Sequence, residues 1–147
     1  MFAGSHQLTI DDKGRLAIPA RYRHLLAQQC QSQMVITLGP NPCLEIYPAP
    51  EFQRLAEEIQ AMEDRQTAET LKSWFIGFAT DSEIDKSGRL LLPSLLRKRV
   101  GLNGQAVLMG QIRRFDVWAE DLWNERFGDG PDGLAASLSD AFRSLKR

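Results

Sequence analysis

Features that mark metalloproteins and disulfide-linked proteins are scarce in this chain of 147 residues. The sequence has only two cysteines, Cys30 and Cys43, which form no Cys-x-x-Cys pair, and only two histidines, His6 and His24. Metal sites need several such ligands at short intervals, and disulfide frameworks need more cysteines. We therefore predict reduced, structural thiols and neither a metal nor another cofactor.

Long apolar segments are absent as well. No apolar run reaches the length of about 18 residues that a membrane-spanning helix needs, and the N-terminus lacks the basic-then-apolar pattern of a secretory signal. The apolar fraction of 43% is nevertheless sufficient for a globular interior. These features predict a folded protein of the cytoplasm with no membrane partner.

The motifs of common enzymes are missing too. The chain contains no glycine-rich phosphate-binding loop, no His-Glu-x-x-His and no serine or cysteine in a nucleophile motif. Asp11 and Asp85 could in principle act as an acid–base pair. Each, however, has an arginine four residues later, which favours an ionised, salt-bridged carboxylate over one with a raised pKa. We therefore predict that the protein is not an enzyme.

What the chain does contain is a repeated phrase. DDKGRLAIP at residues 11–19 nearly recurs as DKSGRLLLP at residues 85–93, and an isoleucine precedes both copies. A short basic segment, an aliphatic run and an alternating strand that ends in an aromatic residue follow each copy. This self-similarity predicts two tandem repeats. Their expected bounds are 5–52 and 80–124, with a helical connection at 53–79 and a glycine-rich linker plus a C-terminal helix at 125–147.

Each repeat has the pattern of a small β unit. Gly14 and Gly88 are expected to form turns, because glycine readily adopts positive φ. A short strand follows each turn, the proline takes the first position of a short helix, and the two later apolar runs form a β-hairpin. Units of this size bury little apolar surface alone, so we expect both repeats to pair about a pseudo-two-fold axis in one α+β fold.

The net charge of −1 hides a segregation of charge along the chain. Both copies of the phrase and the segments that follow them are locally basic. In contrast, residues 51–69 hold six acids against two arginines, and residues 116–132 hold six acids against one. A polyanion would meet basic islands if the fold groups them on one face, whereas the alternative is that they are ordinary solvated faces.

Arg15 and Arg89 are the strongest binding candidates, because each follows a turn glycine and has a carboxylate, Asp11 or Asp85, that could orient it. Arginine can grip a guanine edge with two hydrogen bonds in a major groove that admits a two-stranded β-ribbon. The alternative, that each Asp–Arg pair only pins its own turn, is equally supported by these residues. The other basic residues would bind phosphates, namely Lys13, Arg21, Arg23, Lys86, Arg97, Lys98 and Arg99.

The first copy, continued as DDKGRLAIPARYR, resembles the DNA-binding segment of AbrB-like regulators and MazE-type antitoxins. The start MFAGSHQLTID, the two Asp-x-x-x-Arg motifs and the pattern from Phe75 to Asp85 closely resemble the MraZ family, and the likeness covers nearly the whole chain. The resemblance implies a pseudo-two-fold, swapped-hairpin β-barrel made by the two repeats, with flanking helices.

The resemblance also implies a function. Members of that family are bacterial transcription regulators that bind repeated promoter boxes, associate with the nucleoid and form rings. For this chain, the resemblance implies a repressor-type regulator of a division and cell-wall gene cluster. Its partners would be double-stranded DNA that carries direct repeats and further copies of the chain. Asp11, Arg15, Asp85 and Arg89 match the two family motifs and would be the DNA-binding residues.

A rival prediction is an interaction protein, such as an antitoxin-like partner or a scaffold, whose contact surface is the acidic segment 51–69. Antitoxins usually carry a disordered tail for their target. Only the short stretch after Gly128 could serve as one here, which weakens this alternative.

Overall fold

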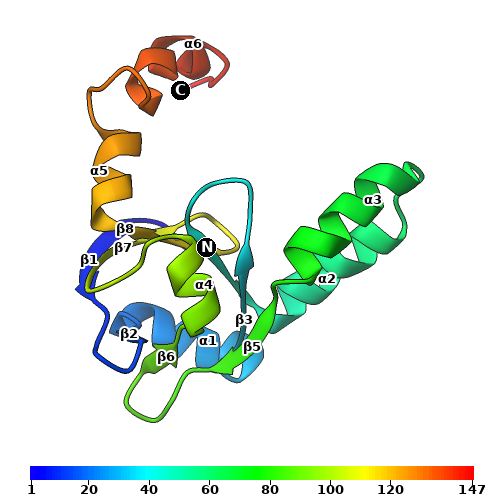
Figure 1. The fold of residues 1–147 in the computed structure, drawn as a ribbon, viewed down its shortest axis with the longest axis vertical. Helices are drawn as coiled ribbons and strands as arrows, with labels where there is room; N and C mark the ends of the chain where they lie inside the picture. The colour runs from blue at the N-terminus through cyan, green and yellow to red at the C-terminus, as the bar shows by residue number, and fades with distance from the viewer.

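The computed structural model describes residues 1–147 and has a mixed α+β architecture (Figure 1). Six strands form one antiparallel sheet in the order β1-β7-β8-β4-β3-β5, and two short strands form a separate ribbon, β2-β6. The strands are β1 (Ser5–Thr9), β2 (Arg15–Ala17), β3 (Gln33–Leu38), β4 (Leu44–Pro48), β5 (Thr80–Glu83), β6 (Arg89–Leu91), β7 (Gln105–Gly110) and β8 (Phe115–Ala119).

The two halves of the chain exchange their first strands. β1 pairs with β7, where Gln7 lies opposite Val107, and β5 pairs with β3, where Val35 lies opposite Asp81. The hairpins β3–β4 and β7–β8 meet in the middle of the sheet through β4 and β8. Neither half completes its part of the sheet alone, because its first strand lies on the hairpin of the other half.

The six-stranded sheet is open, and this corrects the prediction of a closed β-barrel. Its ladder ends at β1 on one side and at β5 on the other. The β2–β6 ribbon lies between these edges, with β2 in contact with β1 and β6 in contact with β5. Each ribbon strand has only three residues and is followed two positions later by Pro19 or Pro93, which has no N–H group, so neither strand can extend a ladder across the gap.

Each ribbon strand leads into a helix, α1 (Ala20–Cys30) or α4 (Ser94–Arg99). Pro19 and Pro93 are the N-cap residues, one position earlier than predicted, with φ of −53° and −58°. The proline ring fixes φ, while its carbonyl is free to accept the first helical hydrogen bonds. The carbonyl of Pro19 accepts from the N–H groups of Tyr22 and Arg23.

The hydrophobic core lies between one face of the sheet and a layer made of the ribbon, α1 and α4. Leu16 and Leu90, the central residues of the ribbon, are fully buried. Leu26 of α1 and Leu96 of α4 belong to the same cluster. Burial of each such side chain contributes about 1.5–3 kcal/mol, so the shared core fixes the ribbon to both halves of the chain. The sheet contributes Met34, Ile36, Leu38, Leu44, Ile46, Ala106, Leu108, Phe115, Val117 and Ala119.

The opposite face of the sheet is covered by other helices. α2 (Ala49–Gln60), α3 (Arg65–Leu71) and the π-helix η1 (Lys72–Ile76) form an arm that projects from the sheet, and α5 (Glu120–Phe127) packs on β7 and β8 (Figure 1). The rings of Phe52 and Phe75 stack at 5.3 Å where the arm meets the sheet. Residues 61–64 separate α2 from α3, and the Asp64 side chain caps α3 by accepting hydrogen bonds from two backbone N–H groups.

Two carboxylates are buried near the middle of the sheet. Glu45 of β4 and Asp116 of β8 lie directly opposite each other on neighbouring strands and are 3% and 4% exposed. The Nε atom of Arg114 donates to Asp116 at 2.8 Å, and its Nη2 atom lies 3.8 Å from Glu45. Burial raises the pKa of Glu45, and the Tyr47 hydroxyl donates a hydrogen bond to it at 2.7 Å. One arginine thus serves both carboxylates.

The C-terminal arm consists of residues 128–133, the 3-10 helix η2 (Leu134–Ser137) and α6 (Leu138–Arg143), and it stands away from the sheet (Figure 1). No residue of η2 or α6 is buried. None of the helices combines the length and apolar character that crossing a membrane requires.

Candidate nucleic-acid interface

The β2–β6 ribbon brings the two copies of the repeated phrase together with nearly two-fold symmetry. Leu16 pairs with Leu90 at its centre. The carbonyl of Gly88 accepts a hydrogen bond from the N–H of Ile18 at 2.9 Å, and the carbonyl of Gly14 accepts one from the N–H of Leu92 at 2.8 Å. Each turn is therefore bonded to the strand end of the other copy.

The first turn is organised by the Asp11 carboxylate. Its Oδ1 atom accepts hydrogen bonds from the backbone N–H groups of Lys13 at 3.0 Å and Arg15 at 2.8 Å. Its Oδ2 atom accepts one from the Arg15 Nε atom at 2.8 Å. Gly14 has φ of +87°, which explains the need for glycine at this position.

The second turn has the same backbone arrangement. The Oδ1 atom of Asp85 accepts from the N–H groups of Ser87 and Arg89, both at 2.9 Å, and Gly88 has φ of +78°. The side-chain pair is looser, because the Arg89 Nε atom lies 3.3 Å from the Asp85 Oδ2 atom and makes no hydrogen bond. The two copies thus differ in how firmly the arginine is held.

The hydrogen bonds of these turns lower the pKa of both carboxyl groups. For Asp11 and for Asp85 the largest cause is the N–H of the arginine four residues later, and each falls below its ordinary value of 3.8. Both groups are therefore charged at neutral pH. A lowered pKa makes each carboxylate a weaker base, and a charged carboxylate is suited to bind a guanidinium.

The outer face of the ribbon carries both arginines. Residues alternate between faces in a strand, so the burial of Leu16 and Leu90 places Arg15, Ala17, Arg89 and Leu91 on the outer side. The side chains of Arg15 and Arg89 are 27% and 36% exposed, and Leu91 is 53% exposed. The face therefore presents two guanidinium groups beside two apolar side chains. Ala17 and Leu91 were not predicted as site residues; the alternation of the strand is the signal that identifies them.

Arg23 and Arg97 lie on the turn glycines of the opposite copy. A Cβ atom added to Gly14 would be 2.6 Å from the Nη2 atom of Arg97, and one added to Gly88 would collide with the Nη1 atom of Arg23. Both glycines are buried as a result. The helix of each half thus covers the turn of the other half.

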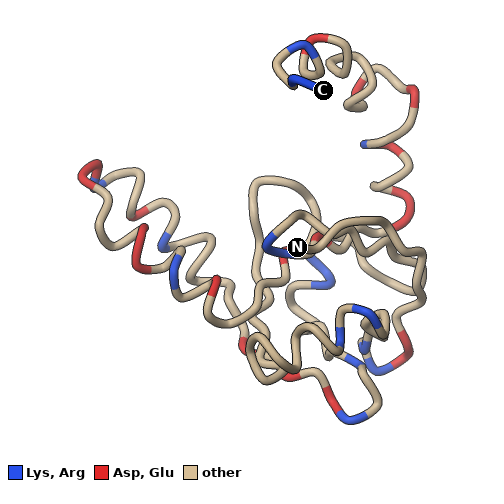
Figure 2. The backbone as a smooth tube through the Cα atoms, turned by 180° about the vertical axis from the view of Figure 1, so that it is seen from behind, with Lys and Arg blue, Asp and Glu red and all other residues tan.

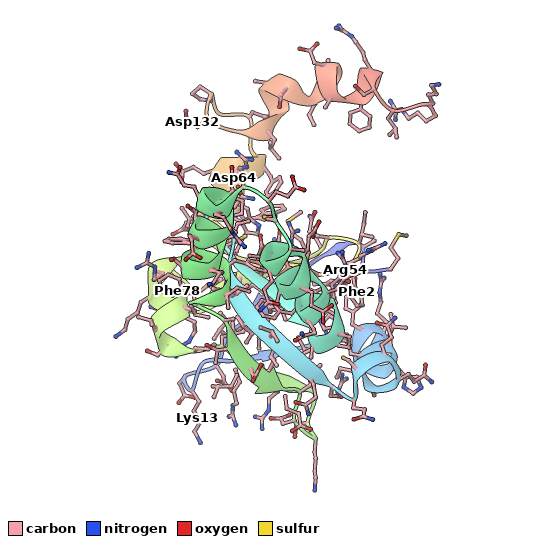
Figure 3. The ribbon with its side chains drawn as sticks, turned by 90° about the vertical axis from the view of Figure 1, so that its right-hand side faces the viewer. Phe2, Lys13, Arg54, Asp64, Phe78 and Asp132 are labelled. Carbon is pink, nitrogen blue, oxygen red and sulfur yellow. The ribbon has the colours of Figure 1, made fainter.

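Further basic side chains surround the ribbon. Lys13 and Lys86 are exposed in the first and second turn, and His24 and Lys98 are exposed on α1 and α4. Lys and Arg gather at the ribbon end of the molecule, whereas acids line the α2–α3 arm (Figure 2). Lys13 lies at the end opposite the C-terminal arm (Figure 3). Most of the basic residues of the two repeated segments therefore lie at the ribbon end of the molecule.

Two predicted phosphate-binding residues lie elsewhere. The Arg21 guanidinium donates to the carbonyl of Ala3 at 2.9 Å and lies over the ring of Tyr22. The Arg99 guanidinium lies 5.1 Å from the ring centroid of Trp74, on the side of the α2–α3 arm. Their positions in the sequence resemble those of the other basic residues, so the difference is visible only in the structure.

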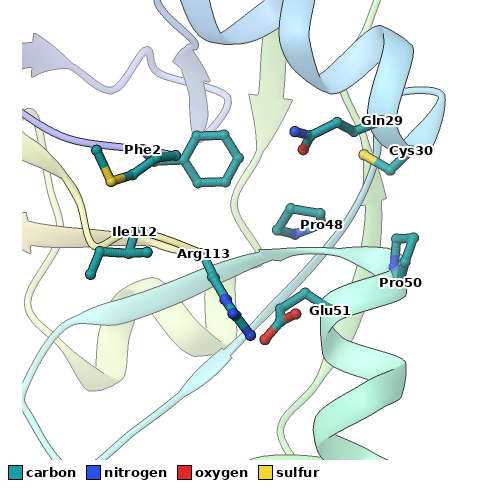
Figure 4. Close-up of a pocket in the computed structure, with 9 residues that line it drawn as sticks. Phe2, Gln29, Cys30, Pro48, Pro50, Glu51, Ile112 and Arg113 are labelled. Carbon is teal, nitrogen blue, oxygen red and sulfur yellow. The ribbon is translucent and has the colours of Figure 1, made fainter.

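Two cavities bear on the possibility of an acid–base pair, and neither contains both aspartates. One of about 400 Å³ is lined by the N-terminus, the end of α1, the start of α2 and the β7–β8 turn, including Cys30, Glu51 and Arg113 (Figure 4). A polar cavity of about 350 Å³ lies beside the second turn and has Asp85, but not Asp11, in its wall. Neither arrangement provides an acid–base pair.

The cysteines take no part in the interface. Cys30 and Cys43 are both free and buried, and burial raises the pKa of each thiol. Raised pKa values keep thiols protonated and poorly reactive.

A two-stranded β-ribbon is one of the elements that proteins place in a DNA groove, and basic side chains clustered on one face are typical of a nucleic-acid interface. The family model described as "MraZ protein, putative antitoxin-like" matches residues 1–73 and 75–129. The chain belongs to the MraZ family.

Relatives in several bacteria resemble the chain over most of its length, and each bears the name transcriptional regulator MraZ. The protein of Idiomarina loihiensis is 43% identical over 90% of this chain and 88% of its own. That of Tolumonas auensis is 35% identical over 99% of both chains. That of Pseudomonas aeruginosa is 39% identical over 84% of this chain and 83% of its own. These relatives are named as regulators of transcription and not as enzymes.

Proposed function

We propose that this protein is a transcriptional regulator that binds double-stranded DNA through the outer face of its β2–β6 ribbon. The observation that carries the proposal is the presence of both Arg15 and Arg89 on the outer face of one ribbon, each beside a charged aspartate. The relatives' names support regulation of transcription, and a DNA major groove admits a two-stranded β-ribbon.

The ribbon reads bases through two kinds of contact. Arg15 and Arg89 each donate two hydrogen bonds to a guanine edge. Ala17 and Leu91 lie across the ribbon from these arginines and supply apolar contacts of the kind that recognise the methyl group of thymine. Asp11 and Asp85 orient the guanidinium groups.

Phosphate contacts set the affinity and its salt dependence. Lys13 and Lys86 flank the ribbon at its two ends and are placed to reach the DNA backbone on either side. Arg21 and Arg99 are exposed but point away from the ribbon, and their proposed role is limited to phosphates outside the groove.

At the level of the whole regulator, residues 5–52 and 80–124 act as two DNA-binding repeats of swapped-hairpin type, with 53–79 and 125–147 as connecting and terminal segments. Several copies assemble, in a closed ring, and present their ribbons to direct repeats in the promoter of the protein's own gene cluster. The regulator acts as a repressor in the cytoplasm, at the nucleoid. Weak single contacts are strengthened when several are made at once.

The test is binding to the DNA immediately upstream of the protein's own gene, first located by footprinting. Replacing Arg15 and Arg89 together by Ala should abolish preference for the protected sequence and leave the elution volume and circular dichroism unchanged. The matched control replaces Arg113 and Arg143, two exposed arginines away from the ribbon, and should retain that preference. Retention of sequence preference by the Arg15→Ala, Arg89→Ala protein at physiological salt would contradict the proposal.

The same experiment separates the rival function. An interaction protein that uses the acidic α2–α3 arm would bind a basic protein and give no footprint. Replacing Glu57 and Glu58, exposed acids on α2, by Gln would then abolish its function, whereas the DNA-binding regulator should tolerate the change.

A further inference from the structure

We propose that Arg23 and Arg97 are positioning residues that hold the DNA-binding turn of the opposite repeat. Arg97 on α4 would set the geometry of Arg15, and Arg23 on α1 would set that of Arg89. This inference rests on the proposed function of the ribbon. It reassigns both residues from the phosphate contacts that the sequence suggests.

The first observation is the contact itself. The Arg97 guanidinium occupies the place where any side chain at Gly14 would begin, since a Cβ atom there would lie 2.6–2.8 Å from three of its atoms. Arg23 occupies the same place on Gly88. A guanidinium lying flat on a turn leaves the turn no room to move toward the helix. Both glycines are consequently buried, although their turns project from the molecule.

The second observation is that Arg97 is itself fixed. Its Nε atom donates to the carbonyl of Leu92 at 2.9 Å, and the N–H of Leu92 donates to the carbonyl of Gly14 at 2.8 Å. Leu92 follows β6 and is fully buried. These two hydrogen bonds therefore connect α4 and the end of β6 to the turn that contains Gly14. The Nε donor of Arg97 is already used in a hydrogen bond within the protein. This is expected of a residue that positions the turn, whereas a phosphate-binding arginine would keep its donors free.

The third observation is a matching difference between the two halves. Arg23 lacks the bond that fixes Arg97, because its Nε atom is buried without a hydrogen-bond partner. On the turn covered by Arg97, the Nε atom of Arg15 donates a hydrogen bond to the Oδ2 atom of Asp11 at 2.8 Å. On the turn covered by Arg23, the Nε atom of Arg89 lies 3.3 Å from the Oδ2 atom of Asp85 and makes no hydrogen bond. Arg97, which has a hydrogen bond of its own, therefore contacts the turn in which the Asp11–Arg15 hydrogen bond is formed.

The consequence is coupling between the two repeats. Residues in one contact network act non-additively, whereas distant residues act additively. A change at Arg97 should act through Arg15, which lies in the other repeat, and not through Arg89, which lies in its own. The reverse holds for Arg23. A phosphate contact would produce no such crossed pattern.

The test compares Arg97→Ala and Arg97→Lys in the full-length protein, on the footprinted sequence and on unrelated DNA. We expect about a tenfold loss of affinity for the footprinted sequence, with little loss on unrelated DNA and no change in salt slope. Lysine should not restore affinity, because it keeps the charge but lacks the flat guanidinium. The effect of Arg97→Ala should vanish in the Arg15→Ala background and persist in Arg89→Ala. Arg23→Ala should show the mirror pattern with a smaller effect.

Three results would overturn the inference. One is full rescue by lysine together with a salt slope that falls by about 0.9 in Arg97→Ala, as expected for a lost phosphate contact. Another is equal loss on both DNA sequences. The last is an additive effect with Arg15→Ala.

A measurement without DNA keeps the inference testable if the proposed function fails or if a variant folds poorly. In Arg97→Gln, the Nε–H NMR signal of Arg15 should shift and exchange faster, while that of Arg89 stays unchanged. Arg23→Gln should affect Arg89 alone. Signals that respond only within one repeat would refute the crossed arrangement, whatever the protein binds. If the crossed NMR pattern holds but the wild-type protein shows no sequence preference, only the DNA-binding function fails.

Discussion

The carboxylate of Asp11 uses its two oxygen atoms for different tasks. Oδ1 holds the turn through backbone N–H groups, and Oδ2 holds the side chain of Arg15. The sequence left open whether the aspartate pins the turn or orients the arginine. In the first copy the structure has it do both, whereas in the second copy Asp85 holds the backbone and makes a looser ion pair.

A prediction at the residue scale concerns Leu91, which is 53% exposed on the outer face of the ribbon. If Leu91 covers a thymine methyl group, uracil at that position should weaken binding about fourfold, since burying one methyl-sized group contributes about 0.8 kcal/mol. Leu91→Ala should bind the thymine and uracil sequences equally. Binding is measured by fluorescence anisotropy on DNA with uracil placed at one footprinted thymine at a time.

The control for this prediction is Leu95→Ala. Leu95 is also an exposed leucine, 63% exposed, but it lies on α4 and not on the ribbon. It should keep the discrimination between thymine and uracil. Equal discrimination by wild type and Leu91→Ala at every thymine would contradict the proposed contact.

Among the elements, the contact between β4 and β8 is the least expected. Sequence alternation correctly indicates strands with one polar position each, at Glu45 and Asp116, and such positions normally face water. Here both carboxylates are almost fully buried and lie opposite each other, with Arg114 close to both. Which side of a strand is covered depends on tertiary packing, which no local pattern encodes.

Arg114→Ala should destabilise the protein by about 2–3 kcal/mol, because it leaves buried carboxylates without their cation; the value is below that of a fully buried pair, since Arg114 is 31% exposed. Burial raises the pKa of Glu45 in the folded state above its ordinary 4.5. Stability is therefore lost as pH rises above 4.5, where the unfolded chain ionises first. The loss caused by Arg114→Ala should be larger at pH 8 than at pH 5.

The measurement is urea denaturation of wild type and variant at both pH values. Arg113→Ala is the matched control, since the neighbouring Arg113 is exposed and should change stability by less than about 0.5 kcal/mol. A pH-independent loss in Arg114→Ala would contradict the role assigned to the buried carboxylates.

On the scale of the whole molecule, the exchange of β1 and β5 makes one folding unit of two repeats. The C-terminal arm lies outside this unit, because η2 and α6 bury no residue. Deleting residues 130–147 should therefore change the free energy of unfolding by less than about 0.5 kcal/mol. Urea denaturation followed by Trp fluorescence checks this, with Phe142→Ala in the full chain as a control. A loss above about 1 kcal/mol would mean that the arm packs on the core.

The sequence by itself determined the local pieces of this protein. The doubled phrase located both turns, because glycine adopts the positive φ of Gly14 and Gly88 far more readily than other residues do. An aspartate four residues before an arginine is also within reach of the arginine's backbone and side chain. The prolines marked the end of each ribbon strand, although they are the N-cap residues of the helices and not the first helical residues as predicted. The resemblance carried by the same residues identified the family.

Only the tertiary structure decided how these pieces combine. Contacts between residues far apart in the chain decide three features. These are the open sheet, the contact of Arg23 and Arg97 with the turn of the opposite repeat, and the position of Arg21 and Arg99 away from the ribbon. A basic residue on a short helix reads the same whether it faces solvent, a ring or the turn of the other repeat. The choice follows from how two incomplete halves bury their shared apolar surface, and that is a property of the assembled core.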